Sequence, residues 1–580
     1  MRRFPVVLLW HMHQPQYRDA FTGEYVLPWT YLHAIKDYSD MAAHLEDNNL
    51  ARAVVNFSPV LIEQLHEYSA LLARHLREAA HIPDVVLASL TEEPLPTAGA
   101  QRLQLMHALL RAQAEHMIKR WAPYVDLVDM LQPFMTVERA TYVSDTMLRD
   151  LSVWYHLAWL GETVRERDPR AAMLLARQKH FTAADRRVLL EVIADVIGNV
   201  LPRYRALQDA GRAEISVTPY AHPILPLLYD FGASREALPS SSLPAHHGYP
   251  GGAERAAWHM DEAIRVYRDT FGIAPRGCWP SEGAVSAATL QLIDRCGFKW
   301  AATSAGVLRG SLPEQNIAAF DQAYRVPDQH LATFFRHDAI SDLIGFQYAT
   351  WHGDDAAENL VQGLCVLADR YAEQPSRIIL IALDGENAWE HYPNNGYHFL
   401  RGMYQRLASH PRFELTTLSA ALQSGLETVP LRHITAGSWV HGTLSTWMGD
   451  AAKNAAWDLL CDAKQAFDRV IAAAKLDDCG VKAAERQLAL CESSDWFWWF
   501  GDYNPADAVD SFDRLYRRQL TTLYRMLDLP VPAALELPIS AGSGAAIQHG
   551  AEHGGAMRRG ELAAGSAAAN LHAVGGTQAS

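Results

Sequence analysis

Cysteine is scarce in this chain, since 580 residues contain six and no two of them form a Cys-x-x-Cys pair. Zinc knuckles and disulfide frameworks need closely spaced cysteines, so we expect free thiols in a reducing cytoplasm. Long apolar runs are also lacking: no stretch is long enough to cross a bilayer, and the run after Arg3 is too short for the core of a signal peptide. The sequence therefore predicts a cytoplasmic protein without a membrane segment.

Clustered positive charge is missing as well. The chain has 51 Lys and Arg against 66 Asp and Glu, for a net charge of −15, and no block of basic residues. Nucleic acids and anionic membranes are therefore not expected as partners. The hydrophobic fraction of 49% over this length is enough for one large catalytic domain and an accessory domain.

Strand-like runs alternate with amphipathic helices through the first 430 residues. The clearest strands are at residues 6–10, 53–57, 214–218 and 298–303, and helical patterns follow several of them. Such alternation predicts an α/β fold with a parallel sheet, and the residue count suits a barrel. We predict a catalytic barrel over residues 1–430, with a helix-rich insertion at about 60–210.

The last part of the chain has a different pattern. From about residue 455 it is almost purely helical, which predicts a mainly helical domain over residues 431–538. Residues 539–580 are rich in Gly, Ala, Ser and His without periodicity, so we expect a disordered tail.

Two carboxylates follow predicted strands. Six apolar residues without alternation lie between Arg377 and Asp384, as in a strand buried on both faces. A shorter strand ends at Glu282, beside Trp279. Since ligands bind at the carboxyl ends of strands in α/β folds, both are candidate catalytic groups. The alternatives are a helix cap for Asp384 and a solvated turn residue for Glu282. If Glu282 and Asp384 lie on the same rim, they are the two carboxyl groups that glycoside hydrolysis requires, one as nucleophile or base and one as proton donor.

Two histidines, His11 and His13, come directly after the first strand. Side chains at i and i+2 of an extended segment point the same way, so they could chelate a metal or hydrogen-bond the hydroxyls of a sugar. A metal site needs further ligands, and only His222 and Asp384 offer themselves. We therefore favour sugar contact and expect no metal site.

Two clusters near the C-terminus are aromatic. One contains Trp439 and Trp447, and the other is Asp495-Trp496-Phe497-Trp498-Trp499. Aromatic rings stack on the apolar faces of sugars while neighbouring polar groups bind hydroxyls. Aromatic residues at helical spacing are more often core than binding site, and on periodicity alone that alternative is favoured. Contiguous tryptophans cannot all face one core side, so we expect at least one ring at a cleft.

The order of these motifs resembles family 57 of the glycoside hydrolases over roughly residues 6 to 502. The resemblance implies an incomplete TIM-like (β/α)7 barrel, followed by an α-helical domain that closes one side of the cleft. It implies retention of anomeric configuration, with Glu282 as nucleophile and Asp384 as acid/base. His11, His13, His222 and Trp389 would line the subsite for the cleaved sugar. The other expected substrate contacts are Gln14, Trp279, Glu386, Trp439, Trp447, Asp495, Trp496 and Trp498.

The motif Trp279-Pro280-Ser281-Glu282 and the aromatic cluster look most like the amylase and amylopullulanase branch of that family. We expect cleavage of α-1,4 bonds in glycogen, starch or maltodextrin, with α-1,6 bonds as a second candidate linkage and no cofactor. One alternative is a 4-α-glucanotransferase that uses the same carboxylates. Others are a metal-dependent barrel hydrolase with His11 and His13 as ligands, and a non-catalytic glucan-binding protein.

Overall fold

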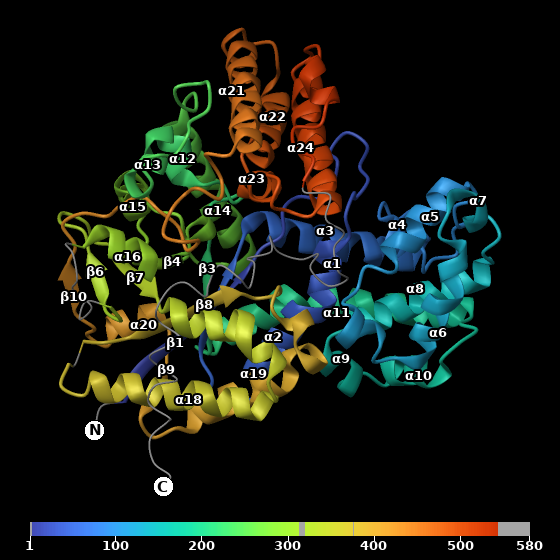
Figure 1. Ribbon diagram of the computed structural model, residues 1–580, viewed down its shortest axis with the longest axis horizontal. Helices are drawn as coiled ribbons and strands as arrows, with labels where there is room; N and C mark the ends of the chain where they lie inside the picture. The colour runs from blue at the N-terminus through green and yellow to red at the C-terminus, as the bar shows by residue number, and fades with distance from the viewer. Residues whose placement is uncertain (1–2, 313–319, 375, 543–580) are drawn as a thin grey trace.

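Parallel strands close into a barrel in the computed structural model, seen in the left half of Figure 1. The structure describes residues 3–312, 320–374 and 376–542. Within these residues the barrel has seven strands, in the order β1-β2-β3-β4-β5-β7-β8, and β8 pairs again with β1. The predicted (β/α)7 barrel is confirmed. Its strands are β1 (Phe4–Met12), β2 (Ala53–Phe57), β3 (Ala213–Val217), β4 (Gly277–Cys278), β5 (Trp300–Ser304), β7 (Ala332–Arg336) and β8 (Ile379–Asp384).

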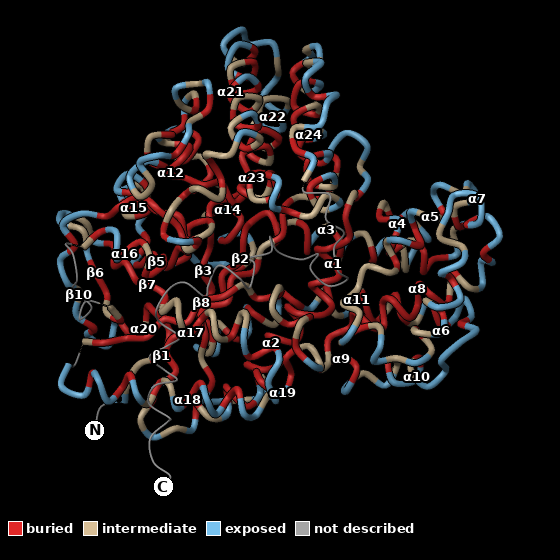
Figure 2. Tube along the Cα trace, viewed as in Figure 1, coloured by how far each residue is buried: buried red, intermediate tan, exposed pale blue. Residues whose placement is uncertain are grey.

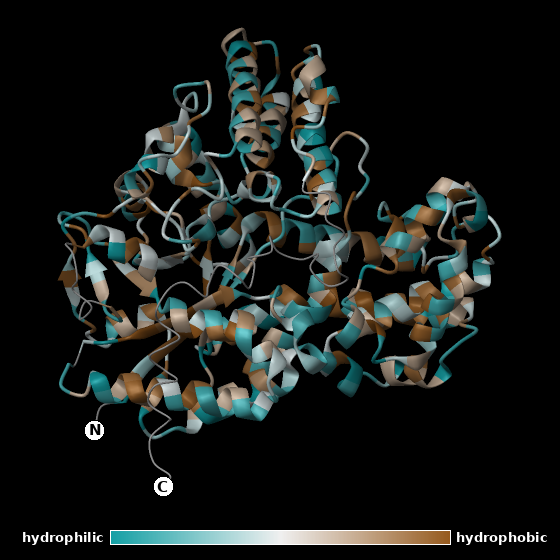
Figure 3. Ribbon diagram, in the orientation of Figure 1, coloured by the Kyte–Doolittle hydropathy of each residue, from teal (hydrophilic) through white to brown (hydrophobic). Residues whose placement is uncertain are grey.

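Side chains of the strands alternate between the barrel interior and the surrounding helices. Val7 and Leu9 of β1 pack inside with Leu380 of β8, whereas Val6 and Leu8 belong to the larger core outside the barrel. Both faces are therefore covered, which is why these strands are apolar without alternation. Figure 3 shows the hydrophobic colour running along the central strands.

Strand register brings the predicted motifs together. His11 of β1 lies opposite Asp384 of β8 on one side and opposite Asn56 of β2 on the other. All barrel strands are parallel, so their carboxyl ends share one rim. Residues far apart in the sequence thus meet at this rim.

Helices fill the segment between β2 and β3, where the sequence predicted a helix-rich insertion, and many of them lie to the right in Figure 1. The longest helix, α11, begins with a capping box in which Thr182 and Asp185 satisfy each other's backbone N–H groups. The helices are α3 (Pro59–Glu78), α4 (Val85–Ala88), α5 (Gly99–Ala108), α6 (Ala122–Leu131), α7 (Val137–Ala140), α8 (Asp145–Trp159), α9 (Glu162–Arg167), α10 (Pro169–Arg177) and α11 (Ala183–Asp209).

The remaining helices connect and cover the barrel strands. Two long ones, α18 and α19, lie side by side along the lower edge in Figure 1. The set comprises α1 (Trp29–His33), α2 (Ser39–Glu46), α12 (Leu225–Tyr229), α13 (Ser234–Ala237), α14 (Gly252–Phe271), α15 (Ala287–Arg295), α16 (Ala305–Ser311), α17 (Asp338–Asp342), α18 (Gly353–Arg370), α19 (Tyr397–Ser409) and α20 (Leu418–Gln423). Short strands β6 (Ala323–Arg325), β9 (Phe413–Leu415) and β10 (Thr428–Pro430) extend the sheet.

The last helices are α21 (Ala451–Ala472), α22 (Asp478–Cys491), α23 (Ser494–Trp499) and α24 (Ala506–Met526). Three of them project upward in Figure 1, and Figure 2 shows their buried sides and exposed outer ends. The division into domains at residues 430 and 538 stays a prediction. The expected start of the tail at residue 539 is wrong, because Ile539 and Ser540 donate backbone N–H groups to Asp513 and Ser540 is buried. Residues 543–580 lie outside the described residues.

Two further predictions concern the membrane and the cysteines. In the described part of the chain, no helix is both long and apolar enough to cross a membrane. All six cysteines are unpaired thiols.

Candidate active site

Glu282 lies in a 3₁₀ turn, Ser281–Gly283, directly after β4. Its backbone is left-handed, with φ +57° and ψ +23°, a conformation that costs energy for a residue with a side chain. The carboxylate is held from one side: the indole Nε1–H of Trp439 donates to Oε2 at 2.9 Å. On the other side Nδ1 of His222 lies 3.8 Å from Oε1. The Glu282 side chain is 15% exposed, so it reaches the cleft from a mostly buried position.

Asp384 ends β8 as predicted, and its side chain is partly buried. Asn387 donates its Nδ2–H to Oδ2 at 2.9 Å, which fixes the carboxylate. The following residue must be small, because a Cβ at Gly385 would lie 2.9 Å from the Met12 side chain. This close approach lets the chain turn away beside β1 while Asp384 stays at the rim.

Both carboxyl groups have raised pKa values. Burial raises the pKa of Glu282 well above its ordinary value, and the nearby charge of Asp384 raises it further, whereas the Trp439 hydrogen bond lowers it. Burial also raises the pKa of Asp384 to about 6, against the lowering effects of Asn387 and of Arg336. Both carboxyls therefore hold a proton to a higher pH than a free carboxyl does, which suits a site that needs a proton donor beside a carboxylate.

Three histidine rings form a stack beside these carboxyls. The rings of His13 and His222 lie 3.9 Å apart with 18° between their planes, and His11 is stacked 5.1 Å from His222. Nε2 of His11 and Nε2 of His222 are 3.1 Å apart. Burial lowers the pKa of His11 to about 3 and that of His222 well below its ordinary value. Both rings are therefore neutral hydrogen-bonding groups near pH 7.

Each ring of the stack is oriented by a polar partner. Nδ1–H of His11 donates to Oδ1 of Asn56 at 2.7 Å. His13 is hydrogen-bonded through Nδ1 to Ser58 at 2.8 Å, and through Nε2 to Oδ2 of Asp495 at 2.9 Å. His222 is bonded through Nδ1 to the hydroxyl of Ser494 at 2.8 Å. The stack is thus rigid, and it brings His11, His13 and His222 of the predicted subsite together with Asp495, while their contact with a sugar stays a prediction.

A metal ion is an alternative occupant of this place, because His13, His222 and Asp495 offer ligand atoms within 4.8 Å of one another. Tetrahedral ligation needs lone pairs that converge on one point. The in-plane lone pairs of two stacked rings lie instead in nearly parallel planes, so they do not converge on one point. The geometry favours hydrogen bonds to the hydroxyls of a ligand over a metal.

The tryptophans divide into two groups. Trp439 and Trp498 are partly exposed and can face a ligand. The other four are fully buried, so direct contact with a substrate, which the sequence predicted for them, is wrong in this structure: Trp279, Trp389, Trp447 and Trp496.

Each buried tryptophan has a packing role. Trp279 supports Trp439 from an edge-on position, with ring centroids 5.2 Å apart. Trp389 donates Nε1–H to the carbonyl of Gly385. Trp496 donates to the carbonyl of Leu490. Trp447 lies beneath Trp498, with ring centroids 5.8 Å apart. These rings shape the site from behind.

Two predicted polar contacts also lie behind the rim. Gln14 is buried and accepts a hydrogen bond from Tyr17 at 2.8 Å. Glu386 is 3% exposed, and its Oε2 has no hydrogen-bond partner among the described residues. Burial and the charge of Asp384 raise the pKa of Glu386 well above its ordinary value. The backbone N–H of His13 donates to this carboxyl, so Glu386 is tied to the residue that follows β1.

Four residues of the site were not predicted from the sequence. Asn56 and Ser58 follow the same rule as Asp384, since both are polar and stand at the carboxyl end of a strand. Ser494 precedes Asp495 in the predicted aromatic cluster. Arg336 ends β7, a strand that the sequence did not reveal, and its guanidinium lies 5.5 Å from the Trp439 ring.

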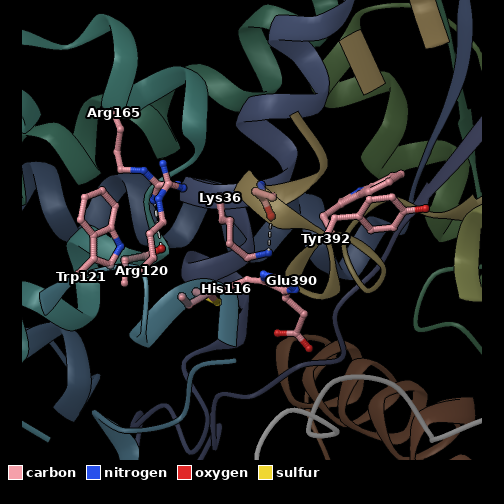
Figure 4. Close-up of a pocket in the computed structure, with 11 residues that line it drawn as sticks. Lys36, His116, Arg120, Trp121, Arg165, Glu390 and Tyr392 are labelled. Carbon is pink, nitrogen blue, oxygen red and sulfur yellow. Dashed lines mark hydrogen bonds between the residues drawn. The ribbon is translucent and has the colours of Figure 1, made fainter. Parts of the chain in front are cut away.

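A small pocket lies behind the Asp384 loop and not at the carboxylates (Figure 4). Its volume is about 10 Å³, room for a single water molecule. Lys36 points into it and donates to Asn395 at 3.1 Å. The pocket joins the helical insertion to the loop after β8, and it is too small for a sugar.

Comparison with solved structures finds the same architecture elsewhere. A branching enzyme from Thermococcus kodakaraensis is similar at a TM-score of 0.59 with 15% identity, covering 91% of this chain and 90% of that one. The α-amylase AmyC from Thermotoga maritima gives 0.57 and 13%, with coverages of 91% and 93%. A branching enzyme from Pyrococcus horikoshii gives 0.55 and 16%, with coverages of 93% and 98%. Identities this low show a common fold.

Sequence comparison gives the family. No curated protein sequence matches the chain significantly. The model of glycosyl hydrolase family 57 matches residues 7–435, well over half of the chain. This match includes both rim carboxylates and the histidine stack, and the barrel is the one that the family resemblance implied. The chain is therefore an enzyme that belongs to glycosyl hydrolase family 57.

Proposed function

We propose that the protein is a retaining enzyme that cleaves α-1,4-glucosidic bonds in glycogen, starch or maltodextrin. The observation that carries this proposal is the pair Glu282 and Asp384, two carboxyls with raised pKa values at one rim beside the histidine stack. A proton donor and a carboxylate nucleophile are what double displacement at a sugar requires.

In the first step Asp384 gives its proton to the glycosidic oxygen while Glu282 attacks the anomeric carbon. The carbon–oxygen bond to the leaving sugar breaks, and an ester between Glu282 and the retained sugar forms. Oε2 of Glu282 accepts the Trp439 hydrogen bond, which leaves Oε1 for the attack. In the second step Asp384 removes a proton from the incoming hydroxyl, which displaces Glu282 and restores the α configuration.

The proposed substrate class rests on the sugar-binding chemistry of the site and on the family. The neutral rings of His11 and His222 suit hydroxyl groups, and Trp439 and Trp498 offer partly exposed faces for a pyranose. Solved structures with this fold include an α-amylase and branching enzymes. Hydrolysis is our first proposal, with α-1,6 cleavage as an extension, and 4-α-glucan transfer through the same ester is the second.

A cytoplasmic location fits the unpaired cysteines, three of which are buried thiols. The helical segment after residue 431 contributes Trp439 and Asp495 to the site. We propose that this segment forms a domain that closes one side of the cleft.

The test is incubation with maltoheptaose and with pullulan, followed by sizing of the products. Shorter products indicate hydrolysis, and longer chains beside shorter ones indicate transfer. Proton NMR of the first product must show the α anomer, since β product would mean inversion and exclude a covalent ester.

Azide rescue assigns the two roles. Azide added to Glu282→Ala should give a β-glycosyl azide, because it replaces the nucleophile in a single displacement. Azide added to Asp384→Ala should give an α-glycosyl azide, because it intercepts the ester. The reverse pattern would exchange the two roles.

A further inference from the structure

A buried carboxylate, Glu492, lies outside the rim at the end of α22. It is fully buried, and Arg255 of α14 donates to both of its oxygens, with Nη2 2.8 Å from Oε2 and Nε 2.9 Å from Oε1. Tyr249 donates to Oε1 at 2.6 Å. His259 of α14 completes the group, with Nε2 2.7 Å from Oε2. Every oxygen of this carboxylate is therefore bonded.

His259 also forms hydrogen bonds to the loop before His222, in addition to its bond with Glu492. Its Nδ1 accepts the backbone N–H of Ala221 at 3.4 Å, and its carbonyl oxygen accepts the N–H of Tyr220 at 3.1 Å. With Nδ1 as an acceptor, the ring proton is on Nε2 and is donated to Glu492. The ring thus connects the loop that ends at His222 to the end of α22.

The residues that closely follow Glu492, Ser494 and Asp495, lie in the site. Ser494 donates its backbone N–H to the carbonyl oxygen of His222 at 3.0 Å, and its hydroxyl is bonded to Nδ1 of the same residue. Asp495, the next residue, holds His13. The two loops therefore meet at His222, and each is fixed to Glu492 within a few residues.

The His222 loop needs such support. Its backbone φ is +61°, a left-handed conformation that persists only where neighbouring contacts hold it. A buried ion pair is a costly way to gain stability, since well-packed apolar residues often do as well. The Arg255–Glu492 pair instead fixes an orientation, because a bidentate guanidinium holds the carboxylate in one position.

We propose that Glu492, fixed by Arg255 and His259, is a positioning residue that sets His222 from one loop and Ser494 and Asp495 from the other at the sugar-binding subsite. The proposal rests on the function proposed above for that subsite. It makes the α22–α23 junction part of the catalytic apparatus although both carboxylates stand on the barrel. Weakening the anchor should shift the histidine stack and reduce transition-state binding more than ground-state binding.

The test uses the full-length protein with His259→Phe, which removes both side-chain bonds and keeps a ring. Tyr516→Phe is the matched control: it removes one buried hydrogen bond, to the carbonyl of Ala456 in α21, and keeps the ring that packs against Trp496 of α23. Hydrogen exchange on peptides containing Ala221 and Ser494 measures the two loops, and kinetics on maltoheptaose measure the site. We expect both peptides to exchange faster in His259→Phe only. We also expect kcat/KM to fall at least tenfold relative to the control, mostly through kcat.

His259→Lys separates the two arms of the anchor. Its ammonium can still donate to Glu492 but has no acceptor for the N–H of Ala221, so only the Ala221 peptide should loosen. This variant decides the question if His259→Phe does not fold. The proposal would be overturned if both peptides kept their wild-type protection from hydrogen exchange in either His259 variant. It would also be overturned if kcat/KM of His259→Phe lay within twofold of that of Tyr516→Phe. Hydrogen exchange needs no substrate, so a protein inert toward glucans would refute the proposed function while this readout still tests the anchor.

Discussion

Trp439 donates two hydrogen bonds to Glu282. Its backbone N–H donates to the Glu282 carbonyl at 3.1 Å, and its indole Nε1–H donates to Oε2 at 2.9 Å. The first bond fixes the strained turn, and the second favours the ionised carboxylate. A nucleophile in a mostly buried position needs such a donor, because burial otherwise favours the neutral acid. One residue of the segment after the barrel thus fixes the backbone of Glu282 and favours the charged form of the carboxyl that we propose as the nucleophile.

Trp439→Phe should lower kcat/KM by about 10- to 100-fold, since it removes a hydrogen bond to a charged group. Without the donor the pKa of Glu282 rises, so the acid limb of the pH profile should move to higher pH. Trp279→Phe is the control, because Nε1 of Trp279 has no hydrogen-bond partner in the described chain. Equal shifts of the acid limb in both variants would show that packing alone is responsible.

Arg336→Gln should move the basic limb of kcat/KM to higher pH. The positive charge favours the ionised form of Asp384, so its removal raises a pKa that is already about 6. We expect a shift of about 0.5 to 1 pH unit. Arg309→Gln is the control, since Arg309 is exposed and lies 3.4 Å from Asp338, which Arg336 also approaches. A shift to lower pH, or none, would contradict this role.

Catalysis should be independent of metal. The parallel rings of His13 and His222 suit hydroxyls better than a tetrahedral ion, so dialysis against a strong chelator should leave activity unchanged. Elemental analysis of the active protein should find no stoichiometric transition metal. Activity that is lost on chelation and restored only by zinc would instead support the metal-dependent barrel hydrolase.

Acid should weaken the protein through Glu492. Burial alone would raise the pKa of Glu492, but Arg255 and His259 outweigh it and lower the pKa to about 2. The unfolded chain binds this proton near pH 4.5, so the contribution to stability is complete above that pH and is lost as pH falls toward 2. The free energy of unfolding, measured with urea from pH 6 to 2.5, should fall less steeply in Glu492→Gln. Glu78→Gln, at an exposed ion pair, controls for the loss of a carboxyl as such.

Much of the fold could be predicted from the sequence because the barrel strands are buried on both faces. The run before Asp384 and the run at residues 53–57 have no alternation, so they were found nearly to the residue. Strand β7, Ala332-Thr-Phe-Phe-Arg336, mixes polar and aromatic residues and was not recognised. Arg336 was missed for the same reason, because it can be placed at the rim only when β7 is recognised as a strand that ends there.

Candidate site residues were found best where a strand delivers them. Glu282, Asp384, His11 and His13 all lie at or just past the carboxyl ends of barrel strands. The tryptophans were harder to assign, since a ring that supports a site and a ring that contacts a sugar have the same local pattern. Helix α23 buries Trp496 and leaves Trp498 partly exposed, and only packing against α24 decides which is which.

Left-handed backbone at Glu282 and His222 has a consequence beyond this structure. Glycine adopts such angles freely, whereas a side chain there costs roughly 1 to 2 kcal/mol. Selection for folding alone would favour glycine at both places. Both side chains are therefore held at a cost in stability, and among the twelve described non-glycine residues with positive φ these two approach each other, with His222 Nδ1 3.8 Å from Glu282 Oε1. A glycine at either place should therefore relax the backbone and remove a side chain from the rim.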